Sequence, residues 1–211
     1  MEKDLSNLRM SYEKERFDKR DADASPIQQF SKWFDQAMQL GEYEANAMML
    51  STVSAEGKPS SRMVLLKEFG TRGFVFFTNY NSRKGKEIAE NPNACITFYW
   101  APLEKQVRIE GVIEKVSDEE SDAYYYSRPH GSQAGAIASE QSSIIENREM
   151  LENKFIELEK QENLKRPDDW GGYVLIPNAF EFWQGRPNRL HDRLQYSLLE
   201  NGEWKIDRLA P

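Results

Sequence analysis

The chain has 211 residues and a formal net charge of −7, from 28 Lys and Arg against 35 Asp and Glu. That length fits one large domain, or a domain with an appended segment. The negative charge argues against a general nucleic-acid or anionic-membrane binder, because such proteins normally present a basic face. With the 12 Gly counted in place of the 9 Tyr, the apolar share is about 40%, below the usual ~45–50%. One explanation is a surface that is buried only in an oligomer.

Cysteine and histidine usage limits the compartment and the metal chemistry. Cys95 is the only cysteine, so no intramolecular disulfide can form and the cytoplasm is the expected location. Together with His130 and His191, the only two histidines, it cannot supply the usual Cys₄, Cys₂His₂ or His₃ zinc sets, and we expect no metal site. No apolar run approaches the ~20 residues that span a bilayer, and the first ten residues lack the apolar centre of a signal peptide.

Two domain-level segments are expected. Residues 1–24 carry 13 charged side chains, bury too little to order themselves, and are interpreted as a mobile N-terminal arm. Residues 25–211 are expected to form a single domain. It opens with a helix that has Ser25 as cap and Pro26 in its first turn, and that ends at Gly41.

Short β-branched or aromatic runs separated by turn sequences then predict strands. The expected strands are 47–53, 61–67, 74–79, 94–100 and 105–116, with a short helix, capped by Ser82, between the third and the fourth. Ser117 and Glu120 form a capping box for a helix that reaches Pro129. A longer helix is predicted over about 143–161, followed by strands at 171–177, 180–185, 193–199 and 204–210. The pattern predicts an α+β fold, an antiparallel β-barrel or strongly curled sheet with peripheral helices.

Two cations stand where a helix begins. Arg83 and Lys84 follow the strand end Thr78–Ser82, and the positive end of a helix dipole disfavours cations unless an anion is bound. A phosphate site is one interpretation, and solvated surface cations are the other.

Arg62 and Lys67 bracket an apolar strand. A regular strand sends them to opposite faces, because they are separated by an odd number of residues. They could serve one ligand that wraps the strand end, or two ligands, and strand-end cations are also common without any ligand.

A third segment combines oxyanion-binding side chains. Tyr124 and Arg128 are four apart on a helix and share a face, and Ser132 follows nearby. These three side chains could bind an oxyanion, or could be a helix end with an aromatic packing face. Gln141 and Ser142 are either part of a helix cap or hydrogen-bond donors to a ligand.

The fourth segment, 181–193, holds three arginines, a histidine and a tryptophan within an acidic chain. Arg and Trp suit planar, anionic, aromatic ligands. His191 and Asp192 are sequence neighbours, and neither a Gly-x-Ser-x-Gly motif nor a P-loop occurs, so nothing indicates nucleophilic catalysis. A lone histidine is more often structural, but this arginine-dense loop favours a functional one.

Taken in order, these segments resemble the pyridoxamine 5′-phosphate oxidase family. The match runs from about 46 to 211 and includes RMVLLK, TNYNSRKGKEIAENP, QVRIEG, YYYSRPHGSQAGAIASEQSS, WGGY, EFWQGRPNRLHDR and WKIDRLAP. The resemblance implies an α+β, antiparallel FMN-binding split β-barrel with peripheral helices, and a homodimer with FMN at the subunit interface.

The resemblance also assigns roles to individual residues. The residues expected to bind FMN are Arg62, Met63, Val64, Leu65, Leu66, Lys67, Phe77, Thr78, Ser82, Arg83, Lys84, Gln106, Gln141, Ser142, Trp183 and Arg193. Those expected to bind substrate are Arg9, Met10, Ser11, Tyr12, Lys67, Tyr124, Arg128, Ser132, Arg189, Leu190 and His191. Arg189 and His191 are the expected catalytic residues, over the pyridine ring, and Arg9–Tyr12 would cover the site as a lid.

The activity implied by the resemblance is FMN-dependent oxidation of pyridoxine 5′-phosphate or pyridoxamine 5′-phosphate to pyridoxal 5′-phosphate. O₂ would be the electron acceptor, and H₂O₂ would be released, with ammonia from the amine. This is a reaction of vitamin B6 salvage and the final step of pyridoxal phosphate synthesis. Two rivals are a non-catalytic flavin or pyridoxal-phosphate binding protein and a flavin reductase that uses a nicotinamide donor. Neither nucleic acid nor a membrane is an expected partner.

Overall fold

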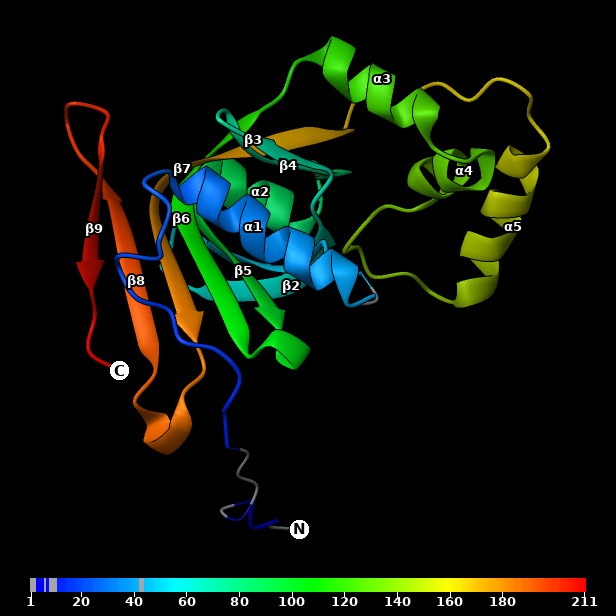
Figure 1. The fold of residues 1–211 in the computed structure, drawn as a ribbon. Coiled ribbons are helices and arrows are strands. Elements are labelled where there is room, and N and C mark those ends of the chain that lie inside the picture. The colour runs from blue at the N-terminus through cyan, green and yellow to red at the C-terminus, as the bar shows by residue number, and fades with distance from the viewer. Residues whose placement is uncertain (1–2, 6, 8–10, 42–43) are drawn as a thin grey trace. The chain divides into compact units, whose positions relative to one another are not determined.

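The computed structural model describes residues 3–5, 7, 11–41 and 44–211. The chain divides into two compact units, each built from several segments. Unit 1 comprises residues 1–46, 97–109 and 178–211, and unit 2 comprises 47–96 and 110–177. In chain order (Figure 1), the elements are α1 (Pro26–Gln39), β1 (Ala47–Val53), β2 (Pro59–Leu65), β3 (Glu68–Gly70), β4 (Gly73–Asn79), α2 (Arg83–Glu90), β5 (Asn93–Trp100), β6 (Lys105–Lys115), α3 (Asp118–Ser127), α4 (His130–Ala138), α5 (Arg148–Glu159), β7 (Trp170–Gln184), β8 (Asp192–Leu198) and β9 (Trp204–Arg208).

The strands form one hydrogen-bonded ladder sequence, β2-β1-β5-β6-β7-β4-β3, with β8 paired to β7 and β9 to β8. The registered pairs are antiparallel, as the alternating strand patterns predicted. The prediction of separate strands at 171–177 and 180–185 is wrong, because β7 runs unbroken through Pro177. Pro177 lies where β7 changes partner, after the last residue paired with β4 and before the first paired with β8. A missing N–H therefore interrupts neither of these two ladders.

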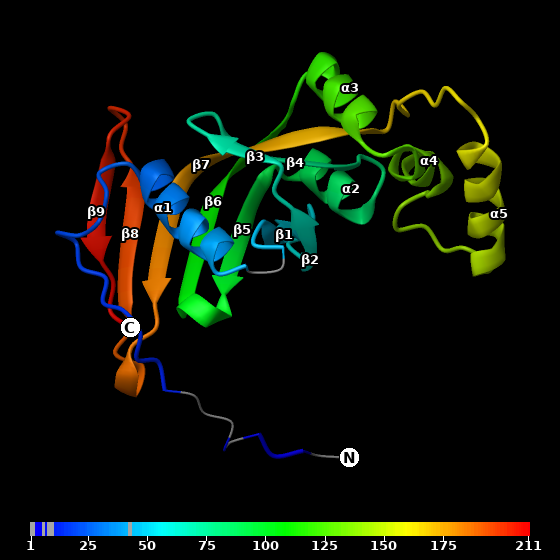
Figure 2. The same cartoon turned by 45° about the vertical axis from the view of Figure 1, so that its right-hand side comes forward.

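Helix starts in unit 2 follow their caps. The Ser82 hydroxyl accepts a hydrogen bond from the Gly85 N–H, and the Ser117 hydroxyl accepts one from the Glu120 N–H, as predicted. The helix predicted over 143–161 is shorter, since Asn147 caps α5 and the helix begins at Arg148. Helix α4 was not predicted, because it is rich in glycine and alanine and has no apolar stripe. It packs against α5 (Figure 2).

The core of unit 1 is aromatic. The α1 residue Trp33 meets Phe182 of β7 edge-on at 5.3 Å between ring centroids, and Phe17 lies 4.9 Å from Trp33. Phe17 belongs to the segment interpreted as a mobile arm, yet it is only 6% exposed. This part of the segment therefore packs within unit 1, while the domain boundaries themselves remain a prediction.

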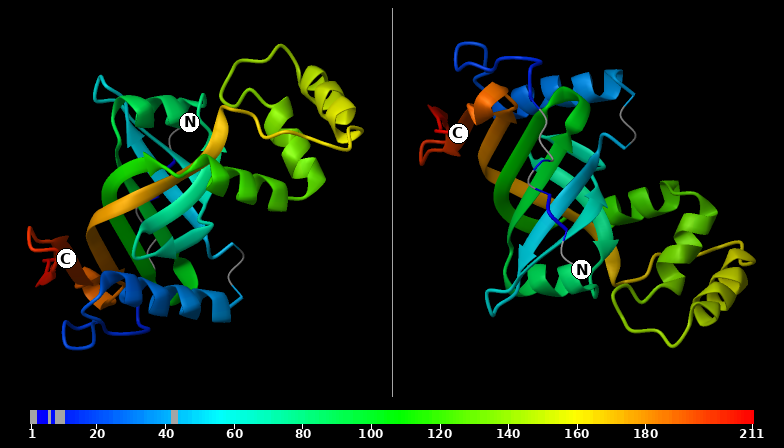
Figure 3. Two further views of the ribbon diagram at one scale, coloured as in Figure 1. Left: turned by 90° about the horizontal axis from the view of Figure 1, so that it is seen from above. Right: turned by 90° about the horizontal axis from the view of Figure 1, so that it is seen from below.

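The β8–β9 hairpin, orange and red in Figure 3, turns at Asn201-Gly202 as predicted. Gly202 has φ +83°, a conformation that glycine adopts without strain. None of the helices within the described ranges is long and apolar enough to cross a membrane.

A buried lysine ties the N-terminal segment to unit 1. The Lys105 side chain is 2% exposed, and its Nζ lies 2.7 Å from the Glu15 carboxylate. It also donates to Gln36 Oε1 at 2.5 Å and lies 4.9 Å from the Trp33 ring centroid. Since a buried ammonium is costly without a counter-charge, Glu15 stabilises the docked position of its segment.

We expect Glu15→Gln to lower the free energy of unfolding by roughly 1–2 kcal/mol, because it leaves Lys105 buried without its carboxylate. The value lies below that of a fully buried pair because the Glu15 side chain is 54% exposed. Chemical denaturation measures it. The matched control is Glu56→Gln, which removes the same charge from the exposed pair with Lys58. Equal losses in the two variants would contradict the anchoring role of Glu15.

Candidate active site

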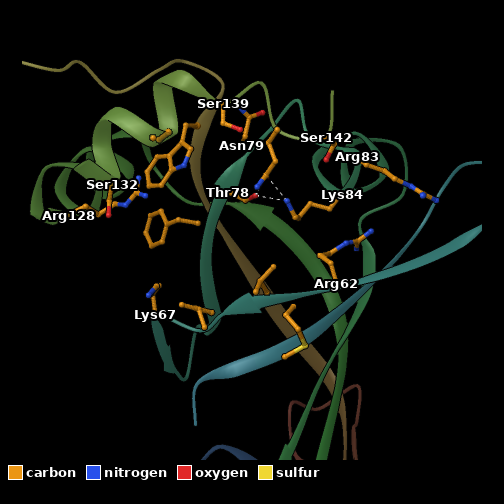
Figure 4. A pocket seen from close by; sticks show the side chains of 18 of the residues that line it. Arg62, Lys67, Thr78, Asn79, Arg83, Lys84, Arg128, Ser132, Ser139 and Ser142 are labelled. Atoms are coloured by element: carbon orange, nitrogen blue, oxygen red, sulfur yellow. Dashed lines mark hydrogen bonds between the residues drawn. The ribbon is translucent and has the colours of Figure 1, made fainter. Parts of the chain in front are cut away.

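A cavity of about 1040 Å³ opens within unit 2 (Figure 4). Its volume is at the upper end of the ~300–1,000 Å³ range of small-molecule sites. Strands β2 and β4, helices α2, α3 and α4 and the loop after α4 contribute its lining. The sequence-predicted site residues that it brings together are Arg62, Met63, Val64, Leu65, Lys67, Phe77, Thr78, Arg83, Lys84, Tyr124, Arg128, Ser132, Gln141 and Ser142.

The loop from β4 into α2 holds a buried ammonium against neutral oxygens. Lys84 is 7% exposed, and its Nζ donates to Thr78 Oγ1 at 2.8 Å, Gln141 Oε1 at 2.8 Å and Ser82 Oγ at 3.1 Å. Burial, and then the charge of Arg62, lower the pKa of Lys84 to about 8. No carboxylate is among these three acceptors, so the position is suited to an incoming anion.

The tight approach of this loop depends on Gly85. A Cβ at Gly85 would stand 2.1 Å from the Tyr80 carbonyl oxygen, which is far inside van der Waals contact. The loop can therefore fold back on the first turn of α2 only because residue 85 has no side chain.

Arg62 and Lys67 both line this cavity, although a regular strand would send them to opposite faces. The reason is that β2 ends at Leu65, so the alternation of side chains stops before Lys67. Figure 4 shows Arg62, Arg83 and Lys84 on one side of the cavity and Lys67, Arg128 and Ser132 on the other.

An aromatic wall accompanies the second cation group. Phe77 stacks on Tyr124 with 3.9 Å between centroids, and Trp170 stacks on Phe77 at 5.7 Å. The Arg128 guanidinium lies 4.8 Å from the Trp170 ring, and Lys67 Nζ lies 6.0 Å from the Tyr124 ring. Arg128 Nη1 is buried and has no hydrogen-bond partner among the described residues. Burial also lowers the pKa of Arg128, against the opposing effect of Tyr124 and Tyr125. A buried donor in this state favours an anionic ligand.

Two predicted residues of unit 2 do not line the cavity. Leu66 is buried. Ser82 is also buried, where it caps α2 and accepts a hydrogen bond from Lys84. Several residues that line the cavity were not predicted: Ser60, Ser61, Asn79, Pro129, Gly135, Ala136, Ser139 and Trp170. Ser60 stands two residues before Arg62, so strand periodicity could have found it. No local pattern marks Trp170, which is distant in sequence and comes beside Asn79 only through the pairing of β7 with β4.

Unit 1 gathers a second set of predicted residues. Trp183 and His191 have ring centroids 4.7 Å apart, and Tyr12 meets both edge-on, at 5.5 and 5.8 Å respectively. Arg193 pairs with Trp183 in the β7–β8 register and bonds the Glu181 carboxylate at 2.9 Å. A Cβ at Gly185 would lie 2.7 Å from Cγ of the Tyr12 ring, so glycine lets that ring approach β7.

The hydrogen bond of His191 fixes its tautomer. Nδ1 accepts the Arg186 backbone N–H at 3.1 Å, so the proton of the neutral ring lies on Nε2. Burial, followed by the charges of Arg189 and Arg193, lowers the pKa of His191. At neutral pH the ring is therefore an uncharged hydrogen-bond donor.

The remaining predicted residues are more dispersed. Arg189 has φ +62° and Asn188 φ +56°, a left-handed pair that bears strain for residues with a Cβ. Leu190 is 68% exposed, Gln106 is half-buried on β6, and Ser11 is exposed. The predictions for Arg9 and Met10 fall outside the described residues.

The donor set of the unit 2 cavity fits a flavin mononucleotide. A phosphate monoester suits Arg83 and Lys84 at the start of α2, together with Arg62 of β2 and the Thr78 hydroxyl of β4. The stacked aromatic wall suits a planar ring system. The unpartnered Arg128 Nη1 on the opposite side would suit a second anionic group.

Comparison with known proteins identifies the fold class. A solved FMN-binding protein of Nostoc punctiforme, described as pyridoxamine 5′-phosphate oxidase-related, aligns with 89% of this chain and 98% of its own at 17% identity and a TM-score of 0.71. PhzG of Burkholderia lata, solved with tetrahydrophenazine-1-carboxylic acid, is 33% identical over 91% of this chain and 95% of its own, with a TM-score of 0.87. The chain thus has the FMN-binding split-barrel fold.

Sequence relatives identify the family. Residues 34–162 match the family described as pyridoxamine 5′-phosphate oxidase, and residues 170–211 match the pyridoxine 5′-phosphate oxidase C-terminal dimerisation region. Pyridoxine/pyridoxamine 5′-phosphate oxidase of Nostoc punctiforme is 56% identical over the full length of both chains. The chain belongs to the pyridoxamine 5′-phosphate oxidase family and is an oxidoreductase of that family.

Lys84 makes anion binding depend on pH. In the protein without bound ligand, Lys84 loses its proton as the pH rises through about 8. A bound phosphate would stabilise the ammonium and raise the pKa of Lys84. Affinity for FMN should therefore be highest below pH 8 and fall above it, while the phosphate monoester, with its second pKa near 6, stays a dianion. Fluorescence titration of the apoprotein between pH 7 and 9.5 measures this. Lys84→Met should bind more weakly and without the pH step; a flat wild-type profile would contradict the assignment.

Proposed function

We propose that this protein is an FMN-dependent oxidase that converts pyridoxine 5′-phosphate or pyridoxamine 5′-phosphate to pyridoxal 5′-phosphate in the cytoplasm. O₂ accepts the electrons and H₂O₂ is released, with ammonia from the amine. The observation that carries the proposal is the pair of cation groups on opposite sides of one cavity. Two separate anionic groups, one on the cofactor and one on the substrate, explain both.

The proposed cofactor site uses the cation group formed by β2 and the start of α2. Arg62, Arg83 and Lys84 bind the FMN phosphate, with the Thr78 hydroxyl beside them. Gln106, Gln141 and Ser142 hydrogen-bond the flavin, and Trp183 and Arg193 flank it. FMN supplies hydride acceptance and reaction with O₂, which no side chain of the chain offers.

The proposed substrate site uses the other group. Lys67, Tyr124, Arg128 and Ser132 bind the substrate phosphate, a non-reacting handle whose binding energy can be directed to orientation. Arg189 holds the pyridine ring by its charge, and His191 donates a hydrogen bond from Nε2. Ser11 and Tyr12 close over the ring as a lid, and the other two predicted lid residues, Arg9 and Met10, lie outside the described residues. These residues bind, orient and exclude water, and none is assigned as an obligatory base.

We further propose a homodimer in which FMN binds at the subunit interface. Two observations support this: the match of residues 170–211 to a dimerisation region and the low apolar share of the chain.

The test is the visible spectrum of the FMN-loaded protein before and after anaerobic addition of pyridoxine 5′-phosphate. Bleaching of the flavin bands that recovers in air is expected for the oxidase. Intact bands at saturating substrate would overturn it and leave a binding protein. Bleaching only with NADPH would instead identify a flavin reductase.

Arg189→Ala should lower the rate of flavin reduction by roughly 100-fold, since loss of ring alignment costs about that much. FMN affinity should remain nearly unchanged, because Arg189 is not assigned to the cofactor. Stopped-flow reduction and flavin titration measure the two quantities. Lys205→Ala, which removes an exposed cation paired with Asp207 in the same unit, is the control. Reduction at the wild-type rate in Arg189→Ala would refute the role.

A further inference from the structure

One buried carboxylate stands behind the cations of the proposed phosphate site. Glu87 lies on α2, three residues after Lys84, and is 5% exposed. Its Oε2 accepts hydrogen bonds from the hydroxyls of Thr52 at 2.5 Å and Ser60 at 2.6 Å. It is absent from the cavity lining, so it acts on a ligand only through its neighbours.

Glu87 also binds two arginines that do line the cavity, one on each carboxylate oxygen. Oε2 lies 3.2 Å from Arg62 Nη2, and Oε1 accepts from Arg83 Nε at 2.9 Å. Arg62 comes from β2 and Arg83 from α2, so the carboxylate joins two elements that reach the cavity separately. The Arg83 side chain is 64% exposed, and its ion pair with Glu87 holds it against the protein.

The Glu87 carboxylate is ionised at neutral pH and well below it. Burial raises its pKa, but the hydrogen bonds of Ser60, Thr52 and Arg83 and the charge of Arg62 outweigh that effect and hold the pKa at about 2. Below pH 8, where Lys84 keeps its proton, the two guanidinium groups and the ammonium contribute three positive charges and Glu87 one negative charge. The resulting charge of +2 matches a phosphate monoester dianion.

We propose that Glu87 is a positioning residue for the FMN phosphate: it holds the Arg62 and Arg83 guanidinium groups in place and sets the cluster to the charge of a monoester dianion. This inference rests on the proposed cofactor site. It assigns the residue no contact with flavin or substrate.

Positioning and simple electrostatics have opposite consequences at this site. Removing a negative charge beside a phosphate strengthens attraction, so electrostatics alone makes FMN bind more tightly to Glu87→Gln. If Glu87 instead holds the arginines in place, the same change removes the ion pairs of Arg83 and Arg62. Both guanidinium groups then lose their fixed positions, and FMN binds less tightly. The sign of the change therefore separates the two.

The experiment is a fluorescence titration of apoprotein with FMN and, separately, with riboflavin, which lacks the phosphate. For Glu87→Gln we expect about a tenfold weaker affinity for FMN, the loss of about one charge-assisted hydrogen bond, and an unchanged affinity for riboflavin. Glu90→Gln is the control, because Glu90 is exposed on the same helix, bonds the Ala55 N–H, and carries the same charge.

The outcomes are distinct. Unchanged or tighter FMN binding by Glu87→Gln overturns the positioning role, and so does an equal loss for FMN and riboflavin, which indicates a general structural effect. If the wild-type protein binds FMN no more tightly than riboflavin, the proposed cofactor site and the inference both fail. If the wild-type protein prefers FMN but Glu87→Gln does not weaken FMN binding, the inference alone fails. Should Glu87→Gln not fold, Glu87→Asp tests the same point, since it keeps the charge but is too short to reach both arginines, and its FMN affinity should fall likewise.

Discussion

The Lys84 ammonium is buried against three neutral oxygens, and much of the candidate site follows from that placement. The charge destabilises the unliganded fold, because its acceptors only partly replace water and Arg62 adds repulsion. The loop that imposes the position is itself constrained, by the Ser82 cap and by the absence of a side chain at Gly85. A bound anion relieves the desolvation of Lys84, so ligand binding and the stability of this loop are coupled.

The aromatic wall depends on a comparable constraint. A Cβ at Gly172 would lie 2.7 Å from the Phe77 ring, so that ring can approach the β7 backbone this closely only beside glycine. Phe77 in turn contacts both Tyr124 and Trp170. The strand pairing of β4 with β7 thus determines where the stacked rings lie. Lys67 and Arg128, two cations of the second group, lie against the rings of Tyr124 and Trp170.

Local patterns predicted most of the secondary structure, and long-range contacts account for what they missed. Serine caps and strand alternation located α2, α3 and the antiparallel strands, because both signals act within a few residues. Helix α4 was not predicted, since glycine and alanine make no apolar stripe. Strand β7 was predicted as two strands divided at Pro177, but the proline is tolerated because β7 changes its pairing partner there. For the candidate site, Arg83 and Lys84 were singled out by their place at a helix start, and Arg62 and Lys67 by their place at the two ends of an apolar strand. Glu87 and Trp170 were not, because each acquires its role only from side chains distant in sequence.

The anchoring of Glu15 and Phe17 limits how far the N-terminal segment can travel. Tyr12 is three residues from Glu15, and an extended chain spans at most about 3.5 Å per residue, or roughly 10 Å in all. While Glu15 stays paired with Lys105, the Tyr12 backbone is confined to a sphere of that radius. Movement of Tyr12 away from the rings of Trp183 and His191 is then limited to about that distance, and the number of residues between 12 and 15 sets the limit.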